Sequence, residues 1–170
     1  MDRNEIVQAF IALSRRLHEK GVVGEVYIVG GAAIALAFDE RRTTRDIDAV
    51  FEPKGVVYEA AAEVAEELSL PVGWLNDAVK GYLLDDPDRK QVLDLPGLRC
   101  SVGSPRILLA MKVLAHRVGE DEDDVRLLAR ELGLTTAEQV LEVSEEVYGG
   151  RLDAAAQFFV EELLDAPSTD

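Results

Sequence analysis

The sequence is poor in cysteine, histidine and aromatic residues, and it has no long apolar run. Because Cys100 is its one cysteine, the chain cannot form an internal disulfide bond. Its two histidines, His18 and His116, lack the spaced partners of a zinc site. The apolar stretches are too short to span a membrane, and the first ten residues lack the basic start and apolar core of an export signal. We therefore expect a cytoplasmic protein with no membrane partner.

Basic residues are scarce in the last third of the chain. Residues 118–170 contain 15 acidic and 3 basic residues, a net charge of -12, whereas residues 1–117 contain 18 acidic and 15 basic residues, a net charge of -3. Nucleic-acid binding depends on the neutralisation of phosphates by Lys and Arg. The last third is therefore a poor candidate for an RNA-binding surface, and its acidic residues fit the solvated faces of helices.

Periodicity, caps and turn residues predict an α+β fold. The helices are expected at residues 3–20, 32–38, 57–68, 107–117, 121–132, 136–148 and 152–164, with a short helical segment ending near Leu84. The apolar face of the first helix would contain Ile6, Phe10, Leu13 and Leu17, and Leu68 would lie on the inner side of the third. Ser104 is expected to cap the fourth helix, and Pro96-Gly97 to join the last two strands. Strands are expected at residues 22–29, 46–51, 91–95 and 98–102, and residues 70–74 are an ambiguous fifth. We expect a small mixed sheet flanked by helices in residues 1–103. Residues 104–170 are expected to form a helical region that packs on this core in a single compact unit.

Two glycines stand between the first predicted strand and the next helix. Gly30 and Gly31 allow the backbone to approach a ligand closely, and a helix N-terminus offers free amides to phosphate. An isolated glycine pair can equally be a tight turn that only packs a helix on a sheet.

Two aspartates stand two residues apart on the second predicted strand. Because side chains alternate along a strand, Asp46 and Asp48 are expected on one face, and Ile47, Ala49 and Phe51 on the other, apolar face. Carboxylates are ligands that suit Mg²⁺, which also takes substrate phosphates. A D-x-D motif alone can also be a solvated strand face. Together with the glycine turn, however, it predicts one site for phosphate and metal.

These motifs resemble the nucleotidyltransferase superfamily, in which a glycine-serine turn precedes a strand with D-x-D. The resemblance includes the R-x-T-x-R-D-I-D pattern at residues 41–48. Residues 112–115 and 117–124 are similar to the K-x-x-A and R-D-x-x-D segments of minimal AbiEii-type toxins. Residues 74–81, with Trp74-Leu75-Asn76-Asp77 and Lys80-Gly81, are similar to a bacterial domain-of-unknown-function branch of the superfamily. The resemblance covers about residues 22–128.

The resemblance implies a nucleotidyltransferase-like fold and a metal-dependent transfer of a nucleotide from a nucleoside triphosphate to an acceptor. The metal would be Mg²⁺ or Mn²⁺, and the acceptor a tRNA, a protein or a small molecule. A toxin of a toxin-antitoxin pair, with a cognate antitoxin as its partner, is one form of this activity. The alternative is an inactive module of the same fold that binds a nucleotide or a protein.

The resemblance also implies a role for each matching residue. Gly30 and Gly31 would hold the triphosphate, Asp46 and Asp48 would bind the metal, and Lys112 would neutralise phosphate charge. The downstream motif would be completed by Asp124 or Asp121.

The sequence departs from the family pattern at three points, one of which is a longer spacing from Gly31 to Asp46 than in the shortest members. Gly31 replaces the usual serine, so a hydroxyl contact to phosphate is missing. A third metal-binding carboxylate is expected on a later strand, where Asp94 is the positional candidate and Asp77 its competitor. Asp94 is therefore counted with Asp46, Asp48 and Lys112 among the predicted catalytic residues.

Some polar residues have an ordinary structural interpretation beside the functional one. Arg45, with Arg41 and Arg42, can bind phosphate or RNA, but the three can also form a plain surface loop. By default, Lys112 would be a surface lysine on an apolar helix. Asp121 to Asp124 would be a cluster of acids at a helix N-terminus. Trp74 and Cys100 are expected in the core.

Overall fold

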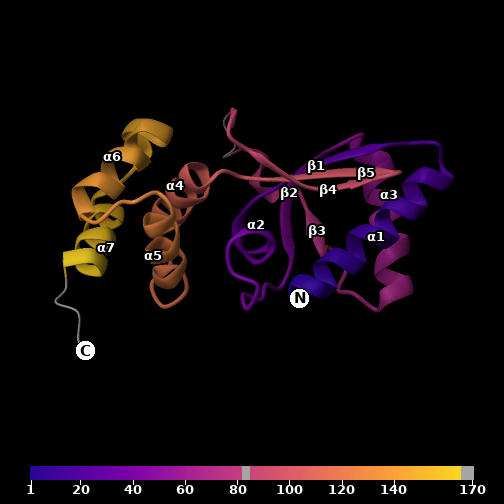
Figure 1. The fold of residues 1–170 in the computed structure, drawn as a ribbon, viewed down its shortest axis with the longest axis horizontal. Coiled ribbons are helices and arrows are strands. Elements are labelled where there is room, and N and C mark those ends of the chain that lie inside the picture. Colours follow the sequence, from indigo (N-terminus) through magenta and orange to yellow (C-terminus); the bar gives the residue numbers. More distant parts are fainter. Residues whose placement is uncertain (82–84, 166–170) are drawn as a thin grey trace. The chain divides into compact units, whose positions relative to one another are not determined.

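The computed structural model describes residues 1–81 and 85–165. Within them the chain forms seven α-helices and a five-stranded mixed sheet, and the predicted α+β class is confirmed (Figure 1). The chain divides into two compact units, Met1–Gly103 and Ser104–Asp170, which we call the sheet unit and the helical unit. No helix in the described ranges is both long and apolar enough to cross a membrane.

The sheet unit holds all five strands in the order β3-β2-β1-β5-β4. The central strand β1 pairs antiparallel with β2 and parallel with β5. The outer strands β3 and β4 pair parallel with β2 and antiparallel with β5, respectively. The elements of this unit are α1 (Arg3–Glu19), β1 (Gly24–Ile28), α2 (Gly30–Ala37), β2 (Ile47–Glu52), α3 (Lys54–Leu68), β3 (Leu75–Asn76), the 3-10 turn η1 (Ala78–Gly81), β4 (Lys90–Leu95) and β5 (Leu98–Val102).

One face of the sheet is apolar and carries the helices of this unit. Helix α1 begins with a capping box between Asp2 and Glu5 and, as predicted, buries one apolar face. Alternate residues of the three central strands are buried, and α1, α2 and α3 contact the sheet. The buried set that these patterns predicted comprises Ile6, Phe10, Leu13, Leu17, Ile47, Ala49, Phe51 and Cys100. The opposite face of the strands is left for polar residues.

The β4–β5 hairpin is fixed to α1 by a glycine. The predicted turn at Pro96-Gly97 joins these two strands, and the Gly97 amide donates a hydrogen bond to Ser14 Oγ at 3.0 Å. A Cβ atom at position 97 would lie 2.2 Å from the Ser14 carbonyl oxygen, so a larger residue would separate the hairpin from the helix.

The structure decides one ambiguous segment and contradicts one local prediction. Residues 70–74 do not form a strand, because β3 begins at Leu75 and contains two residues. Trp74 is buried as predicted, and its indole N–H donates to the Ala61 carbonyl oxygen at 2.9 Å. Leu68, expected on the inner side of its helix, is 39% exposed near the end of α3. The expected helix end near Leu84 lies outside the described residues.

The helical unit contains four α-helices and the short 3-10 helix η2 (Gly149–Arg151). Ser104 caps the first helix through its hydroxyl, as predicted, and Thr136 caps the third in a capping box with Gln139. Helix α6 packs against α4 and α7, around a core of Ile107, Ala110, Val147 and Tyr148. The four helices are α4 (Pro105–Ala115), α5 (Glu122–Glu131), α6 (Ala137–Tyr148) and α7 (Ala154–Asp165).

Candidate functional site

The end of β1 and the start of α2 meet β2 at one corner of the sheet. Gly30 is the first residue of α2 and has a φ of +65°. The Val29 amide donates to the Asp48 carbonyl oxygen at 2.9 Å. A Cβ atom at position 30 would lie 3.3 Å from Asp48 Oδ2. The glycine therefore brings the backbone at the N-terminus of α2 directly beside the Asp48 carboxylate.

The N-terminus of α2 is suited to an anion. Its N-cap residue, Val29, makes no side-chain capping bond, and the first turn contains no acidic residue. The first amides of a helix have no acceptor within the helix and carry the positive end of its dipole. Phosphate oxygens are typical partners of such amides.

Asp48 lies on the face of β2 that is not packed against the helices, and Asp46 immediately precedes the strand, which begins at Ile47. Asp46 is exposed and Asp48 is half-buried, whereas Ile47 between them is fully buried. The alternation expected from the sequence is therefore present. Its physical cause is the pleat of the strand, which sends adjacent side chains to opposite faces.

Asn76 joins this corner, and it was not predicted as a site residue. It lies opposite Asp48 in the parallel pairing of β3 with β2. Its Nδ2 donates to Asp46 Oδ2 at 3.1 Å, and its Oδ1 accepts from the Ala78 amide at 3.1 Å. The signal that could have identified it is the Trp74-to-Asp77 segment, whose buried tryptophan fixes the position of the strand.

The structure does not bring Asp94 to this corner. Asp94 lies opposite Arg99 on β5, in the cross-strand row that continues through Glu25 to Glu52. Glu52 is four residues beyond Asp48, so the row is about 13 Å away along the strand, and β4 is a further three strand spacings, about 14 Å, from β2. Arg99 Nε is 3.7 Å from the Asp94 carboxylate. The prediction of Asp94 as the third ligand is therefore corrected.

Asp77 is next to Asn76, but its carboxylate is held by cations and a phenol. Lys54 Nζ lies at 2.5 Å, the Tyr58 hydroxyl donates at 2.6 Å, and Lys80 Nζ lies at 3.6 Å. The hydrogen bonds from Lys54 and then Tyr58 lower the pKa of Asp77 to about 2. Asp77 therefore connects β3 and η1 to α3. A carboxylate that is already bound by these groups is poorly placed to bind a metal.

Gly31 and residues 41–45, the segment that contains the three arginines, lie close to the same corner. A Cβ atom on Gly31 would lie 3.1 Å from Thr44 Oγ1, so the threonine hydroxyl is beside this second glycine of the turn. This hydroxyl donates to the Asp46 carbonyl oxygen at 2.9 Å. Arg45 is exposed in the connection that leads to β2.

Lys112 and Asp124, also predicted as site residues, belong to the helical unit and bind each other. Lys112 is 6% exposed, and its Nζ lies 2.7 Å from Asp121 Oδ1 and 2.8 Å from Asp124 Oδ2. Arg117 Nε donates to Asp121 Oδ2 at 3.1 Å. Because Lys112 is buried, the expectation that it would be a surface lysine by default is wrong. Its ion pairs fix α5 to the end of α4.

The pKa of Asp121 results from two opposed effects. Burial raises the pKa, because the charged form loses hydration, while the hydrogen bonds and charges of Lys112 and Arg117 lower it more strongly. The pKa of Asp121 therefore lies below its ordinary value. These interactions explain the lysine and aspartates of the downstream motif without a ligand.

Two residues at the corner, Asp46 and Asp48, could hold a cation. Asp46 and Asp48 supply carboxylate oxygens, and Mg²⁺ commonly takes one or two carboxylates together with phosphates and water. In residues 1–81 and 85–165, no group of three or more His, Cys, Asp and Glu could hold a metal ion. A cation at the corner would therefore have to take its other ligands from a phosphate and from water.

Comparison of the chain with protein-family models, with curated proteins and with solved structures gave no match. The geometry of the corner is therefore the basis for assigning a function to this chain.

Proposed function

We propose that the corner formed by Gly30, Gly31, Asp46 and Asp48 binds the triphosphate of a nucleoside triphosphate, and that the chain transfers the nucleotide to an acceptor. The observation that carries this proposal is the approach of the Asp48 carboxylate to the first residue of α2, where a Cβ atom would lie 3.3 Å from Oδ2. An anion-binding helix end and a pair of metal-binding carboxylates are thereby adjacent. That combination serves a triphosphate with its cation better than either feature alone.

The reaction is a substitution at phosphorus. An acceptor hydroxyl oxygen forms a bond to the α-phosphorus, the bond from that phosphorus to the bridging oxygen breaks, and pyrophosphate leaves with the electron pair. The hydroxyl proton passes to water. Asp46 and Asp48 would hold Mg²⁺ or Mn²⁺, which when bound neutralises charge on the phosphates. The amides at the start of α2 orient the phosphate chain, and exposed Arg45 supplies further positive charge.

A second candidate function is nucleotide binding without transfer. It is favoured because neither candidate for a third metal-binding carboxylate is available at the corner. Asn76, which has no carboxylate, occupies the position beside Asp48. Asp94 lies in a different cross-strand row, and Asp77 is bound by Lys54 and Tyr58. In this form the chain is a sensor or a partner-binding module, and an antitoxin or another protein binds it according to whether a nucleotide is bound.

The proposal is tested by calorimetry with each of the four ribonucleoside triphosphates and Mg²⁺. We expect at least one triphosphate to bind. We expect Asp46→Asn, a substitution at an exposed position, to weaken that binding about tenfold or more. Asp94→Asn is the matched control, because it removes the same charge from a row of the sheet that does not contact the corner. Its affinity should stay within about twofold of the parent.

Transfer is then measured with an α-labelled triphosphate and three acceptor classes: bulk tRNA, a protein mixture and hydroxylated small molecules. Label transfer that is lost in Asp46→Asn supports the enzyme, and binding without transfer supports the sensor. If no triphosphate binds, or if Asp46→Asn and Asp94→Asn behave alike, the corner is not a nucleotide site.

A further inference from the structure

Residues 74–81 contain the Trp-Leu-Asn-Asp segment, and the proposed reaction does not use them. Their start is fixed to the sheet unit at two places. The Trp74 indole N–H donates to a carbonyl oxygen of α3 at 2.9 Å, and the Trp74 carbonyl oxygen accepts from the Ile47 amide at 2.7 Å. The parallel pairing of β3 with β2 then places Asn76 beside Asp48. The Asn76 side chain therefore reaches the corner from a firmly held backbone.

Two hydrogen bonds fix the orientation of the Asn76 amide. Its Oδ1 accepts from the Ala78 amide at 3.1 Å, and its Nδ2 donates to Asp46 Oδ2 at 3.1 Å. A reversed amide would turn Oδ1 toward the Asp46 carboxylate and Nδ2 toward another N–H group, so both hydrogen bonds would be lost. The group that Asn76 presents to Asp46 is therefore a donor.

A donor at this place affects the Asp46 carboxylate in two ways. It holds an exposed side chain that would otherwise exchange between rotamers. It also occupies Oδ2 with an N–H group, which repels a cation, whereas Mg²⁺ takes oxygen ligands. A carboxylate at position 76 would instead offer the cation another oxygen. Asn76 therefore orders Asp46 without adding a metal ligand.

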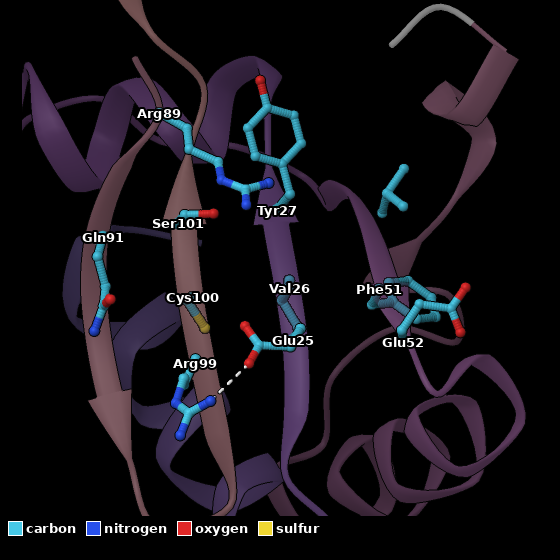
Figure 2. A pocket seen from close by; sticks show the side chains of 11 residues that line it. Glu25, Val26, Tyr27, Phe51, Glu52, Arg89, Gln91, Arg99, Cys100 and Ser101 are labelled. Atoms are coloured by element: carbon cyan, nitrogen blue, oxygen red, sulfur yellow. Dashed lines mark hydrogen bonds and ion pairs between the residues drawn. The ribbon is translucent and has the colours of Figure 1, made fainter. Parts of the chain in front are cut away.

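The glutamates on the polar face of the sheet do not supply the oxygen that Asn76 lacks. Figure 2 shows Glu25 of β1 in contact with Arg99 of β5, at 3.0 Å, and Glu52 on β2. Glu25 and Glu52 lie opposite each other, four residues or about 13 Å along β2 from Asp48. Over the described part of the chain, no Asp, Glu, His or Cys completes a group of three metal ligands with the corner pair.

We infer that Asn76 is a positioning residue for Asp46, and that it limits the corner to a single divalent cation, which arrives with the triphosphate. The inference rests on the proposed function of the corner. Two carboxylates balance the charge of one Mg²⁺, and phosphate and water complete its coordination. In a two-metal site, separate ions stabilise the attacking and the leaving oxygens. A single ion leaves one of these oxygens without a metal, so we expect tight nucleotide binding and slow transfer.

The inference is tested with Mn²⁺ alone, whose free concentration is measured by electron paramagnetic resonance. Asn76→Asp replaces only the donor, because the aspartate keeps an oxygen for the Ala78 amide. We expect this variant to bind Mn²⁺ about tenfold more tightly than the parent, since it offers a third carboxylate. Gln157→Glu is the matched control: it makes the same change of amide to carboxylate at an exposed position of α7 and should bind Mn²⁺ like the parent.

A second measurement counts the Mn²⁺ ions that are held beside each of the four ribonucleoside triphosphates. The parent should hold a single ion per bound triphosphate, and Asn76→Asp should hold a second. Asn76→Ala removes the donor without adding a carboxylate, so it should weaken triphosphate binding about fivefold. The fluorescence of Trp74, the one tryptophan of the chain, should stay unchanged in this variant and show that β3 is in place.

The outcomes separate this inference from the proposed function. Unchanged Mn²⁺ affinity in Asn76→Asp, a second ion in the parent complex, or an equal gain in Gln157→Glu would each overturn the inference. If Asn76→Asp does not fold, the ion count in the parent and the affinity of Asn76→Ala decide. If no triphosphate binds but Asn76→Asp gains Mn²⁺ affinity, the nucleotide function fails and the role of Asn76 at the cation site stands. If triphosphates bind and Asn76→Asp gains nothing, the inference alone fails.

Discussion

Two of the chain's pairs of nearby aspartates have opposite surroundings. Asp46 and Asp48 lie on the open face of the sheet unit, where Asp46 is exposed and receives a hydrogen bond from the amide of Asn76. Asp121 and Asp124 are buried in the helical unit, and both bind the ammonium of Lys112. We propose the first pair as a cation site, whereas the second pair already binds a cation of the chain itself.

This difference shows why a motif match alone does not identify a site. The charge that stabilises a buried carboxylate has to come from the chain, because transfer of an unpaired ion from water to the interior is costly. Lys112 provides it, together with Arg117. Asp46 is exposed and therefore keeps its hydration, so it needs no such charge from the chain. Burial and partners therefore separate a structural ion pair from a candidate metal site.

The largest expected effect is the loss of the buried cation. Lys112→Met should reduce the unfolding free energy of the helical unit by about 3–5 kcal/mol, because it leaves two carboxylates buried without their ammonium. Hydrogen exchange of the α4 and α5 amides measures this loss. Lys80→Met is the control: Lys80 is exposed and contacts Asp77 at 3.6 Å, so its removal should cost about 0.5 kcal/mol or less.

The same variant separates the two interpretations of Lys112. If Lys112→Met folds with normal protection of α4 and α5 but no longer binds a triphosphate, Lys112 is a nucleotide ligand and the comparison of the two pairs fails. Normal triphosphate affinity in a destabilised variant supports the structural assignment.

The second effect concerns acid. Since the pKa of Asp121 is lowered in the folded chain, its stabilising contribution is complete above the unfolded value of about 4 and is lost as the pH falls below it. Protection of the α5 amides should therefore decrease in acid. Asp121→Asn should cost about 1.5–3 kcal/mol at pH 7 and flatten this decrease. Asp46→Asn should change stability by about 0.5 kcal/mol or less, and an acid dependence that is equal in both variants would remove the distinction between the pairs.

The third effect tests the approach of Asp48 to α2. Gly30→Ala places a side chain at a φ of +65° and a Cβ atom 3.3 Å from Asp48 Oδ2. We expect a loss of about 1–2 kcal/mol in unfolding free energy, together with weaker triphosphate binding. Gly55→Ala is the matched control, since Gly55 lies within α3 with no atom close to its missing Cβ, and it should stabilise the chain by about 0.5–1 kcal/mol. Urea unfolding and calorimetry measure both variants.

Local features of the fold were predictable from the sequence because local interactions determine them. The apolar face of α1, the alternation on β2 and the cap at Ser104 depend on residues within a few positions of one another. The strand order could not be derived from such patterns. Because of this order, Asp94 lies in a cross-strand row far from Asp46 and Asp48. The partners of Lys112 are nine and twelve residues away, and contact it only because α5 folds back on α4.

The smallest effect concerns Asp77, the other predicted third ligand. Its carboxyl should titrate with a pKa of about 2, and Tyr58→Phe should raise that pKa, because the phenol no longer donates to the charged form. Carbon-detected NMR of the side-chain carboxyl groups follows both residues in one experiment, and Mg²⁺ with a triphosphate should shift the signal of Asp46 while leaving that of Asp77 in place. An ordinary pKa for Asp77, combined with a shift of its signal by Mg²⁺, would mean that Lys54 and Tyr58 release it in solution. Asp77 would then join the first aspartate pair as a third metal ligand, and the sensor interpretation of the corner would lose its main support.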